Sequence, residues 1–351
     1  MTGIEWAEEV WNPTTGCDRI SDGCDNCYAL KMAGRLKKMG QVKYQNDGSP
    51  RTSGPGFGVT MHPDALEQPF RWTRPRRVFV NSMSDLFHDS VPDGFIAQVW
   101  DVMGRTPWHT YMILTKRHAR MRSWVSRWAD TSGDAERRRG DRTYGMPPMP
   151  RGPVAVRATY ESGRALLFAD MLDSMGTPPE GCAYPLYDWM EGQRFWPAVL
   201  PNVWLGVSAE DQKWADIRIP ALLDTPAAVR FVSAEPLLGR IDLRAHLAGS
   251  CPEHDFPGGF CVQRGHPGVR HLNWLIVGGE SGPGARPMDE EWARTLAIQA
   301  VRAKVPVFVK QLGSVLGKQL GAGPKGGDWD MWPEDLKLRQ FPRVPEMTEA
   351  S

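Results

Sequence analysis

The sequence predicts an α/β protein built as a complete or partial (β/α) TIM-type barrel with parallel strands and an inserted lid or subdomain. Six short apolar runs rich in β-branched residues alternate with segments of helical periodicity. Such runs without polar alternation are typical of strands buried on both faces, and the strand–helix repeat favours a parallel sheet. With a short first strand before Cys17, we expect about seven strands. A doubly wound open sheet is the alternative.

The elements follow in order along the chain. We expect strands within residues 76–85, 110–117, 202–211, 228–236, 272–282 and 305–313. The clearest helix lies within 92–106, where the apolar residues share one face: Phe95, Ile96, Val99 and Met103. A second helix is expected within 289–304, because its acidic start suits a helix N-terminus.

Two long interruptions suggest how the chain is organised. Residues 1–128 would form the N-terminal part of the barrel, and 201–318 its C-terminal part with a Cys/His loop at 245–271. Residues 129–200 are too long for a simple connection and predict an inserted lid or small subdomain. The Gly- and Pro-rich residues 319–351 predict a peripheral tail.

The bulk composition excludes several classes of protein. The 351 residues are 41% hydrophobic and 24% charged with a net charge of +1, which argues against a strong non-specific polyanion binder. The sequence lacks a signal peptide and a long apolar span, so we expect a cytoplasmic protein that does not enter a membrane. In that reducing compartment, clustered cysteines more often bind metal or do chemistry than form disulfides.

Polar or glycine residues follow all six expected strands, at the edge where parallel α/β proteins bind ligands. We call this edge, formed by the carboxyl ends of the strands, the mouth. Helix capping would explain single cases, but a polar mouth explains the whole set better. We take the charged residues Lys116, Glu280 and Lys310 as candidate catalytic residues. Further candidates at the mouth are Ser82, Asp85, Ser208, Glu210, Glu235, Gly278 and Gly279.

Three cysteines in one N-terminal loop are the main candidate metal ligands. Cys17, Cys24 and Cys27 follow the spacing C-x6-C-x2-C, and a glycine precedes each of the first two. A closed structural zinc site needs a fourth Cys or His, whereas three thiolates on a [4Fe–4S] cluster leave one iron open for a cofactor or substrate. The glycines would let the backbone wrap an inorganic core closely. A disulfide between Cys17 and one of the other two is the alternative.

A second group has the residue types of a separate zinc site. Its members follow the spacing C-x2-H-x6-C-x4-H: Cys251, His254, Cys261 and His266. The alternative is an irregular hairpin whose polar residues face water.

Several blocks of the sequence resemble a known family. They are EVWNPTTGCDRISDGCDNCYA, RPRRVFVNSMSDLFHDSVP, TPWHTYMILTKR, LPNVWLGVSAEDQ, VRFVSAEPLLG and LNWLIVGGESGPGARPM. Together they resemble the phage Gp37/Gp68-like proteins, also described as DUF5131, which look like members of the radical S-adenosylmethionine (SAM) superfamily.

The resemblance implies a [4Fe–4S] cluster on the three cysteines and SAM as the cofactor that the reduced cluster cleaves to methionine and a 5′-deoxyadenosyl radical. It places the amino acid part of SAM near Ser82 and Asp85, and the ribose near Ser208 and Glu210. The adenine would lie near the later strands, and Glu235, Gly278 and Gly279 are taken as further cofactor-binding candidates. This chain departs from the usual C-x3-C-x2-C motif: its first gap is six, Asn26 holds the usual aromatic position, and Tyr28, a further candidate for cofactor binding, follows the last cysteine.

The substrate is unknown, and an electron donor is implied as a partner. The abundant Trp, which could stack bases, and a group of arginines suggest nucleic acid or a nucleotide; the arginines are at positions 74, 76, 77, 117, 120 and 122. Ordinary surface arginines over a Trp-rich shell are the alternative. A zinc-stabilised nucleic-acid-binding protein without catalysis and an iron–sulfur electron carrier are the competing functions.

Overall fold

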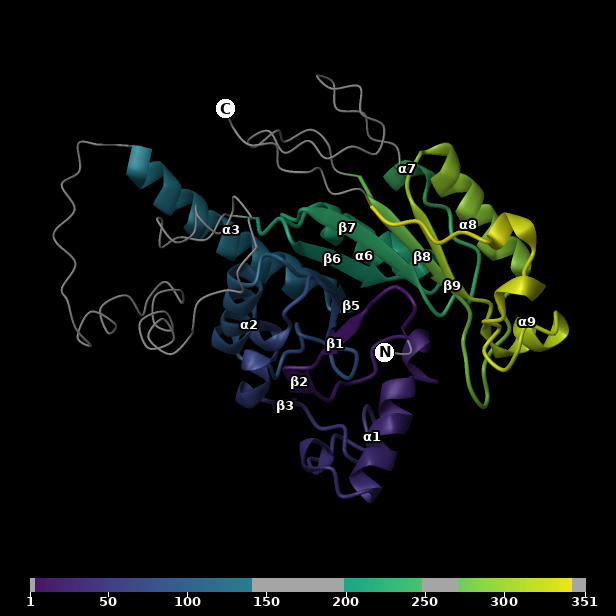
Figure 1. Cartoon of the computed structure of the whole chain (residues 1–351), viewed down its shortest axis with the longest axis horizontal. Coiled ribbons are helices and arrows are strands. Elements are labelled where there is room, and N and C mark those ends of the chain that lie inside the picture. Colours follow the sequence, from purple (N-terminus) through teal and green to yellow (C-terminus); the bar gives the residue numbers. More distant parts are fainter. Residues whose placement is uncertain (1–3, 141–198, 248–270, 343–351) are drawn as a thin grey trace.

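The computed structural model describes residues 4–140, 199–247 and 271–342. Its core is a parallel sheet of seven strands in the order β1-β4-β5-β6-β7-β8-β9 (Figure 1). All six pairings between neighbours are parallel. The strands are β1 (Glu9–Trp11), β4 (Arg77–Val80), β5 (Thr110–Thr115), β6 (Val203–Ser208), β7 (Val229–Ala234), β8 (Trp274–Gly278) and β9 (Val307–Gln311).

The sheet is a partial barrel. Its strands follow one another in sequence order without a reversal, which excludes the doubly wound alternative. Strands β1 and β9 form the two edges, so the described residues do not close a complete barrel. The expected strand positions and the count of about seven are confirmed, including the short first strand before Cys17.

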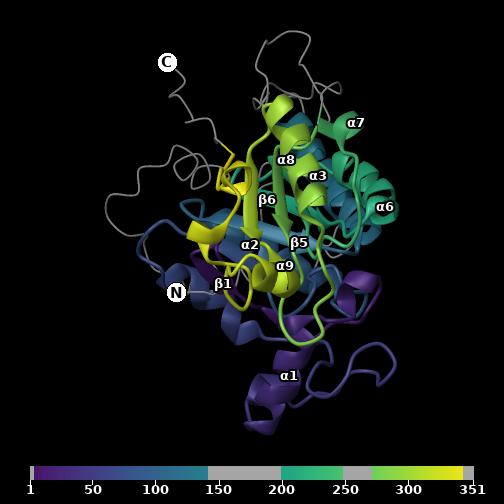
Figure 2. The same ribbon diagram turned by 90° about the vertical axis from the view of Figure 1, so that its right-hand side faces the viewer.

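Helices cover the outer face of the curled sheet (Figure 2). They are α2 (Asp93–Arg105), α3 (His118–Gly140), α6 (Gln212–Leu223), α7 (Arg244–Leu247) and α8 (Glu290–Arg302), and the short helix α9 (Gly313–Gln319) follows β9. The N-cap residues of α6 and α8 are Asp211 and Asp289, and their carboxylates accept hydrogen bonds from Trp214 N–H and Glu291 N–H, respectively. Asp211, which follows an expected strand, therefore has a capping role.

The N-terminal region adds a small layer below the sheet. A two-stranded antiparallel ribbon pairs β2 (Thr14–Thr15) with β3 (Thr60–Met61). The short 3-10 helix η1 (Asp22–Cys24) and the helix α1 (Tyr28–Lys38) follow β2, and two further 3-10 helices lie at Val42–Tyr44 and Pro63–Arg71. No helix among the described residues is both long and apolar enough to cross a lipid bilayer.

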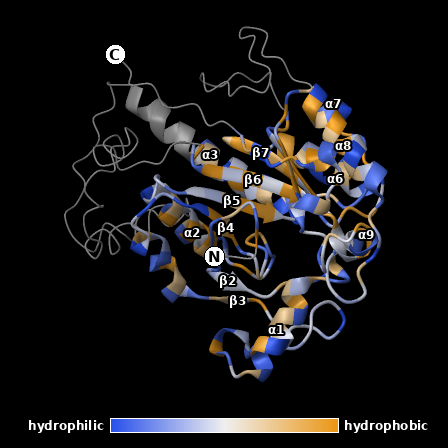
Figure 3. Cartoon of the chain, turned by 45° about the vertical axis from the view of Figure 1, so that its right-hand side comes forward, coloured by the Kyte–Doolittle hydropathy of each residue, from blue (hydrophilic) through white to orange (hydrophobic). Residues whose placement is uncertain are grey.

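Both faces of the sheet are buried, as the unalternating apolar runs predicted, and hydrophobic residues run along its strands (Figure 3). Alternate residues of one strand enter different clusters: Tyr111 and Ile113 pack under the helices, and Met112 faces the concave side. Aromatic rings fill that concave side, and its buried members include Trp6, Phe79, Trp204, Phe231, Trp274 and Phe308. Gly206 makes room for them, because a Cβ there would lie 2.4 Å from the Phe231 ring.

The structure describes part of the expected insert at 129–200 and most of the expected tail at 319–351. Helix α3 continues to Gly140, so the first part of the expected insert at 129–200 is helical; residues 141–198, which hold the expected lid, lie outside the described residues. The expectation of a peripheral tail from residue 319 is wrong up to residue 342. Trp332 and Leu336 are buried in the main core, held by the 3-10 helices Trp329–Met331 and Glu334–Leu336.

Candidate functional site

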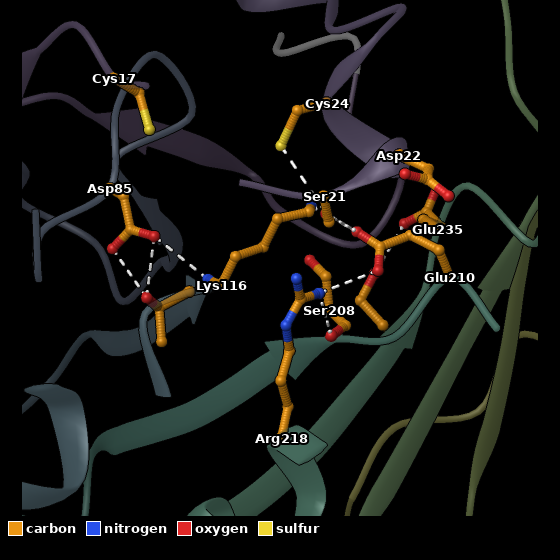
Figure 4. A network of polar contacts seen from close by, with 12 residues as sticks. Cys17, Ser21, Asp22, Cys24, Asp85, Lys116, Ser208, Glu210, Arg218 and Glu235 are labelled. Atoms are coloured by element: carbon orange, nitrogen blue, oxygen red, sulfur yellow. Dashed lines mark hydrogen bonds and ion pairs between the residues drawn. The ribbon is translucent and has the colours of Figure 1, made fainter. Parts of the chain in front are cut away.

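The cysteine loop lies over the carboxyl ends of the central strands, at the mouth (Figure 4). Backbone bonds hold its start there: Gly16 N–H donates to Met83 O at 2.9 Å, and Cys17 N–H donates to Phe57 O at 3.3 Å. Cys24 closes the 3-10 helix η1, and Cys27 is the N-cap residue of α1. The sequence prediction that this loop and the polar strand ends share one edge is therefore confirmed.

None of the three thiols forms a disulfide, and charged side chains lie near them. The pKa of the Cys17 thiol is raised to about 12, chiefly by burial and also by the charges of Asp85 and Cys24, while Arg117 acts to lower it. Burial lowers the pKa of the Lys116 ammonium, but the charges of Glu210, Cys24 and Cys27 hold it above its ordinary value. The alternative of a disulfide is wrong for this structure.

The donor chemistry of this loop fits a thiolate-bound metal group. Thiolates are the soft ligands that zinc and iron–sulfur clusters prefer. Two buried guanidinium groups at the mouth also have nitrogen atoms without a hydrogen-bond partner, namely Nε and Nη2 of both Arg117 and Arg218. Such N–H groups suit an anionic, sulfide-containing core. Within the described ranges, however, no three His, Cys, Asp or Glu side chains already form a preassembled metal site.

Glu210 joins the cysteine loop to the sheet. Its side chain is fully buried, and Oε1 accepts a hydrogen bond from Ser21 Oγ at 2.9 Å and lies 3.3 Å from Lys116 Nζ. Oε2 accepts from Arg218 Nη1 at 2.8 Å. Burial raises the pKa of the Glu210 carboxyl, but Lys116 and Arg218 hold it well below its usual range. Both oxygens are thus engaged by protein groups rather than open to a ribose.

The two glycines before the cysteines allow the loop to approach other protein atoms. A Cβ on Gly23 would lie 2.3 Å from Glu210 Oε1, and one on Gly16 would lie 2.2 Å from Gly58 O. Gly16 also has a φ of +89°, which a side chain rarely adopts. The sequence predicts that these glycines let the loop wrap an inorganic core. In the structure, their close neighbours are the Glu210 side chain and the Gly58 backbone.

Four further candidates lie beside the loop: Tyr28, Ser82, Asp85 and Ser208. Asp85 is buried and accepts from Thr115 Oγ1, Lys116 N–H and Phe87 N–H. The Tyr28 hydroxyl donates to Ser82 O at 2.6 Å, so the residue after Cys27 is tied to the end of β4. Ser208 ends β6, and its carbonyl accepts from Arg218 Nη1 at 3.0 Å.

A second connection holds the middle of the loop through Asn26. Its amide donates to Glu280 Oε2 at 2.9 Å and to Gly284 O at 3.0 Å. Arg286 completes this clamp, because it donates through Nη2 to Glu280 Oε1 at 2.6 Å and to Asp22 O at 2.8 Å. Burial raises the pKa of the Glu280 carboxyl, but donation from Arg286 and Asn26 holds it below its usual range. Glu280 is therefore an ionised anchor for the cysteine loop.

The last strand ends form a separate ion pair. Lys310 Nζ lies 3.0 Å from Glu235 Oε1, and Ser233 Oγ donates to Glu235 Oε2 at 3.1 Å. Burial lowers the pKa of Lys310, but Glu235 holds it above its ordinary value, so Lys310 is an ammonium donor rather than a base. A Cβ on Gly278 would lie 2.6 Å from Glu235 Oε1, and one on Gly279 would lie 2.5 Å from Leu312 O. These glycines accommodate protein groups.

Sequence reasoning missed three residues of the site. Arg218 lies on α6 in the apolar stripe of Ala215, Ile219 and Leu222, and an arginine at such a position was a signal for a buried ion pair. Ser21 and Arg286 left no periodic signal, because each lies in a loop and meets its partner through the fold.

The groups behind the nucleic acid prediction have contacts within the protein. Trp6, Trp204 and Trp274 are buried in the concave core and offer no face to a base, whereas four other tryptophans are only partly buried, namely Trp72, Trp214, Trp292 and Trp329. Four of the six arginines pair with carboxylates: Arg77 with Glu8, Arg117 with Asp89, Arg120 with Asp93 and Arg122 with Asp224. The expected zinc group of Cys251, His254, Cys261 and His266 lies outside the described residues.

Comparison with known proteins gives one match. The sequence model of a family described as a protein of unknown function, DUF5131, matches residues 1–333. The chain belongs to this family. The match includes the whole mouth and the cysteine loop, so the resemblance to DUF5131 is confirmed. No curated protein and no solved structure matches the chain.

Proposed function

We propose that this DUF5131 protein is a radical SAM-type iron–sulfur enzyme. The observation that carries the proposal is the arrangement of Cys17, Cys24 and Cys27, three unbonded thiols on one loop over the mouth of a parallel partial barrel. They are the only cysteines in the part of the chain that the structure describes. Three thiolates suit a [4Fe–4S] cluster with one open iron, and zinc in a structural site would need a fourth ligand.

The residues around the loop have defined tasks in this proposal. Cys17, Cys24 and Cys27 would hold the cluster, which when bound supplies the electron that cleaves SAM to methionine and a 5′-deoxyadenosyl radical. The Lys116 ammonium and the Arg117 guanidinium offset the negative charge of three thiolates, and the buried setting keeps that attraction strong. The clamp of Asn26, Glu280 and Arg286 holds the loop in place over the mouth.

The remaining polar groups would bind the cofactor and the substrate. Lys310 is a charged donor that can meet a carboxylate or a phosphate, while its partner Glu235 can accept from a hydroxyl or an amine. Ser82 and Ser208 lie nearer the cysteine loop and suit the amino acid and ribose parts of SAM. The chemical class of the substrate stays open in this proposal, because several tryptophans are buried and four of the six arginines pair with carboxylates, which weakens the argument for a nucleic acid.

Anaerobic reconstitution tests the proposal. The full chain is incubated with iron and sulfide, its iron and zinc are counted, and it is then treated with dithionite and SAM. We expect a brown protein with about four irons that releases 5′-deoxyadenosine. The Cys17→Ala/Cys24→Ala/Cys27→Ala variant should stay colourless, while Cys182→Ala, the matched control for a cysteine outside the loop, should behave like the wild type.

Two results would count against the proposal. A wild-type protein that remains colourless and contains one zinc would favour the zinc-stabilised alternative. Iron retained in full by the triple variant would show that the cluster has other ligands, and the arrangement at the mouth would then have another purpose.

A further inference from the structure

The outer face of α1 exposes large apolar side chains to solvent. Tyr28, Met32 and Met39 are 53%, 41% and 62% exposed, and Val42 just beyond the helix is 87% exposed. The opposite face of α1 is packed, because Ala29 and Ala33 are buried against Phe57 and Met83. The helix therefore uses small residues to pack against the protein and leaves its long apolar residues outside. Contiguous exposed apolar residues of this kind mark interaction sites.

The same face is basic. Residues 28–43 contain five basic residues and no acidic one. Lys37 pairs with Asp47 and Lys43 with Asp64, but the exposed Arg35 and Lys38 have no carboxylate partner among the described residues. An open hollow lies alongside, lined by Leu30, Lys31, Gly34, Arg35, Lys37, Lys38 and Pro55. A surface that combines unpaired cations with exposed methionines complements an acidic protein surface.

The position of α1 connects this face to the cysteine loop. The helix starts directly after Cys27 and projects away from the sheet (Figure 1). With a rise of about 1.5 Å per residue, Arg35 lies roughly 12 Å from Cys27 along the axis of α1. A partner seated on this face would stand beside the proposed cluster.

We propose that the outer face of α1, formed by Tyr28, Met32, Arg35, Lys38 and Met39, docks an acidic electron-donor protein of the ferredoxin type. This inference rests on the proposed function. The bound partner gives up one electron and is oxidised, and the cluster on Cys17, Cys24 and Cys27 takes up that electron and is reduced. A nucleic acid is the less suitable occupant, because this face has one aromatic residue, Tyr28, whose hydroxyl is engaged with Ser82 O, and its other apolar residues are methionines.

A charge-reversal variant tests the surface. An acidic [2Fe–2S] ferredoxin serves as the probe, and the test variant is Arg35→Glu/Lys38→Glu in the full chain. The matched control is Arg74→Glu/Arg302→Glu, which changes the net charge equally at two exposed arginines without carboxylate partners among the described residues. Both control residues lie at the amino ends of the strands, since Arg74 precedes β4 and Arg302 ends α8 before β9.

Two measurements separate this inference from the proposed function. Binding of ferredoxin to the immobilised chain, with and without cluster, should weaken about tenfold in the test variant and decrease with salt, while the control binds like the wild type. Reduction of the reconstituted cluster by reduced ferredoxin should slow by a similar factor, and reduction by dithionite should be unchanged. If the reconstituted wild type contains no cluster that dithionite reduces, the proposed function fails. The binding measurement still shows whether the outer face of α1 docks ferredoxin.

Three outcomes would overturn the inference. The first is a test variant that matches the control in ferredoxin binding and reduction. The second is a test variant that loses affinity for a single-stranded oligonucleotide while it keeps its affinity for ferredoxin, which would make the face a nucleic acid site. The third is a wild-type chain that does not bind ferredoxin at all.

Discussion

Asn26 donates its side-chain amide to Glu280 at 2.9 Å and so joins two residues 254 positions apart in the sequence. Asn26 lies inside the C-x2-C spacing, and Glu280 follows the strand β8. The bond ties the cysteine loop to the segment that follows β8. It also gives a physical reason for an asparagine at the position where the radical SAM motif usually has an aromatic residue.

Replacing Asn26 by leucine should destabilise the loop. Asn26→Leu removes the donor to a buried carboxylate and to Gly284 O, which we expect to lower the free energy of unfolding by about 1–3 kcal/mol. Urea unfolding measures this change, and iron counting after reconstitution should show lower occupancy. Gln319→Leu, at an exposed amide without a side-chain hydrogen bond among the described residues, is the control and should change neither quantity. Equal iron content in both variants would show that the clamp does not position the cysteines.

Glu210→Gln should be the most damaging substitution at the mouth. It keeps the shape of the side chain but removes the charge that faces Lys116 and Arg218, leaving two cations without their carboxylate. Breaking a buried ion pair from one side costs about 3–5 kcal/mol. The midpoint of urea unfolding measures the loss. The exposed pair of Arg71 and Glu67 provides the control, since Glu67→Gln should leave the midpoint unchanged. A stable Glu210→Gln protein would argue that water reaches this pair.

Gly23→Ala should displace the cysteine loop. The new Cβ would lie 2.3 Å from Glu210 Oε1, and Glu210 cannot move aside because both of its oxygens are engaged. We expect a lower melting temperature and a loss of bound iron. Gly94→Ala is the matched control: no atom lies within 4 Å of its Cβ, and Gly94 is in the helix α2, where alanine should stabilise by up to about 1 kcal/mol. If both variants behave alike, the Gly23 contact does not constrain the loop.

His109 should make stability depend on pH. Its Nδ1 accepts from Arg76 N–H and its Nε2 donates to Pro69 O, so the buried ring is neutral. The pKa of His109 is lowered to about 4, chiefly by burial and also by the charge of Arg76, although the hydrogen bond to Pro69 O acts to raise it. The unfolded state, with a pKa near 6.5, therefore binds the proton first as the pH falls. This contribution is fully present above pH 6.5 and is lost between about pH 6.5 and pH 4, a change of roughly 3 kcal/mol.

The variant His109→Asn isolates this contribution, because asparagine keeps an acceptor for Arg76 N–H but does not titrate. Urea unfolding of wild type and variant at pH 7 and pH 4.5 should show a shallower loss of stability in the variant. Equal losses would mean that His109 is already protonated in the folded protein, against the neutral ring that its two hydrogen bonds imply.

The sequence by itself determined the parallel α/β class, the positions of seven strands and the edge where the functional groups lie. Those features depend on local periodicity: apolar runs form strands such as β6 and β8, and polar residues such as Glu210 and Glu280 directly follow them. Membership of DUF5131 was also readable from contiguous blocks. The three cysteines lie close together in the sequence, so their loop was visible before any fold was known.

Only the tertiary structure decided what each polar group contacts. The sequence could not show that Arg218 and Lys116 share Glu210, or that Arg286 reaches Asp22, because these partners come from separate elements that meet only in the folded chain. It could not show that Gly23 makes room for the Glu210 carboxylate, or that Trp332 and Leu336 enter the core from the C-terminal segment. The physical reason is that burial and charge pairing depend on distances in space, and periodicity reports only which face of its own element a residue occupies.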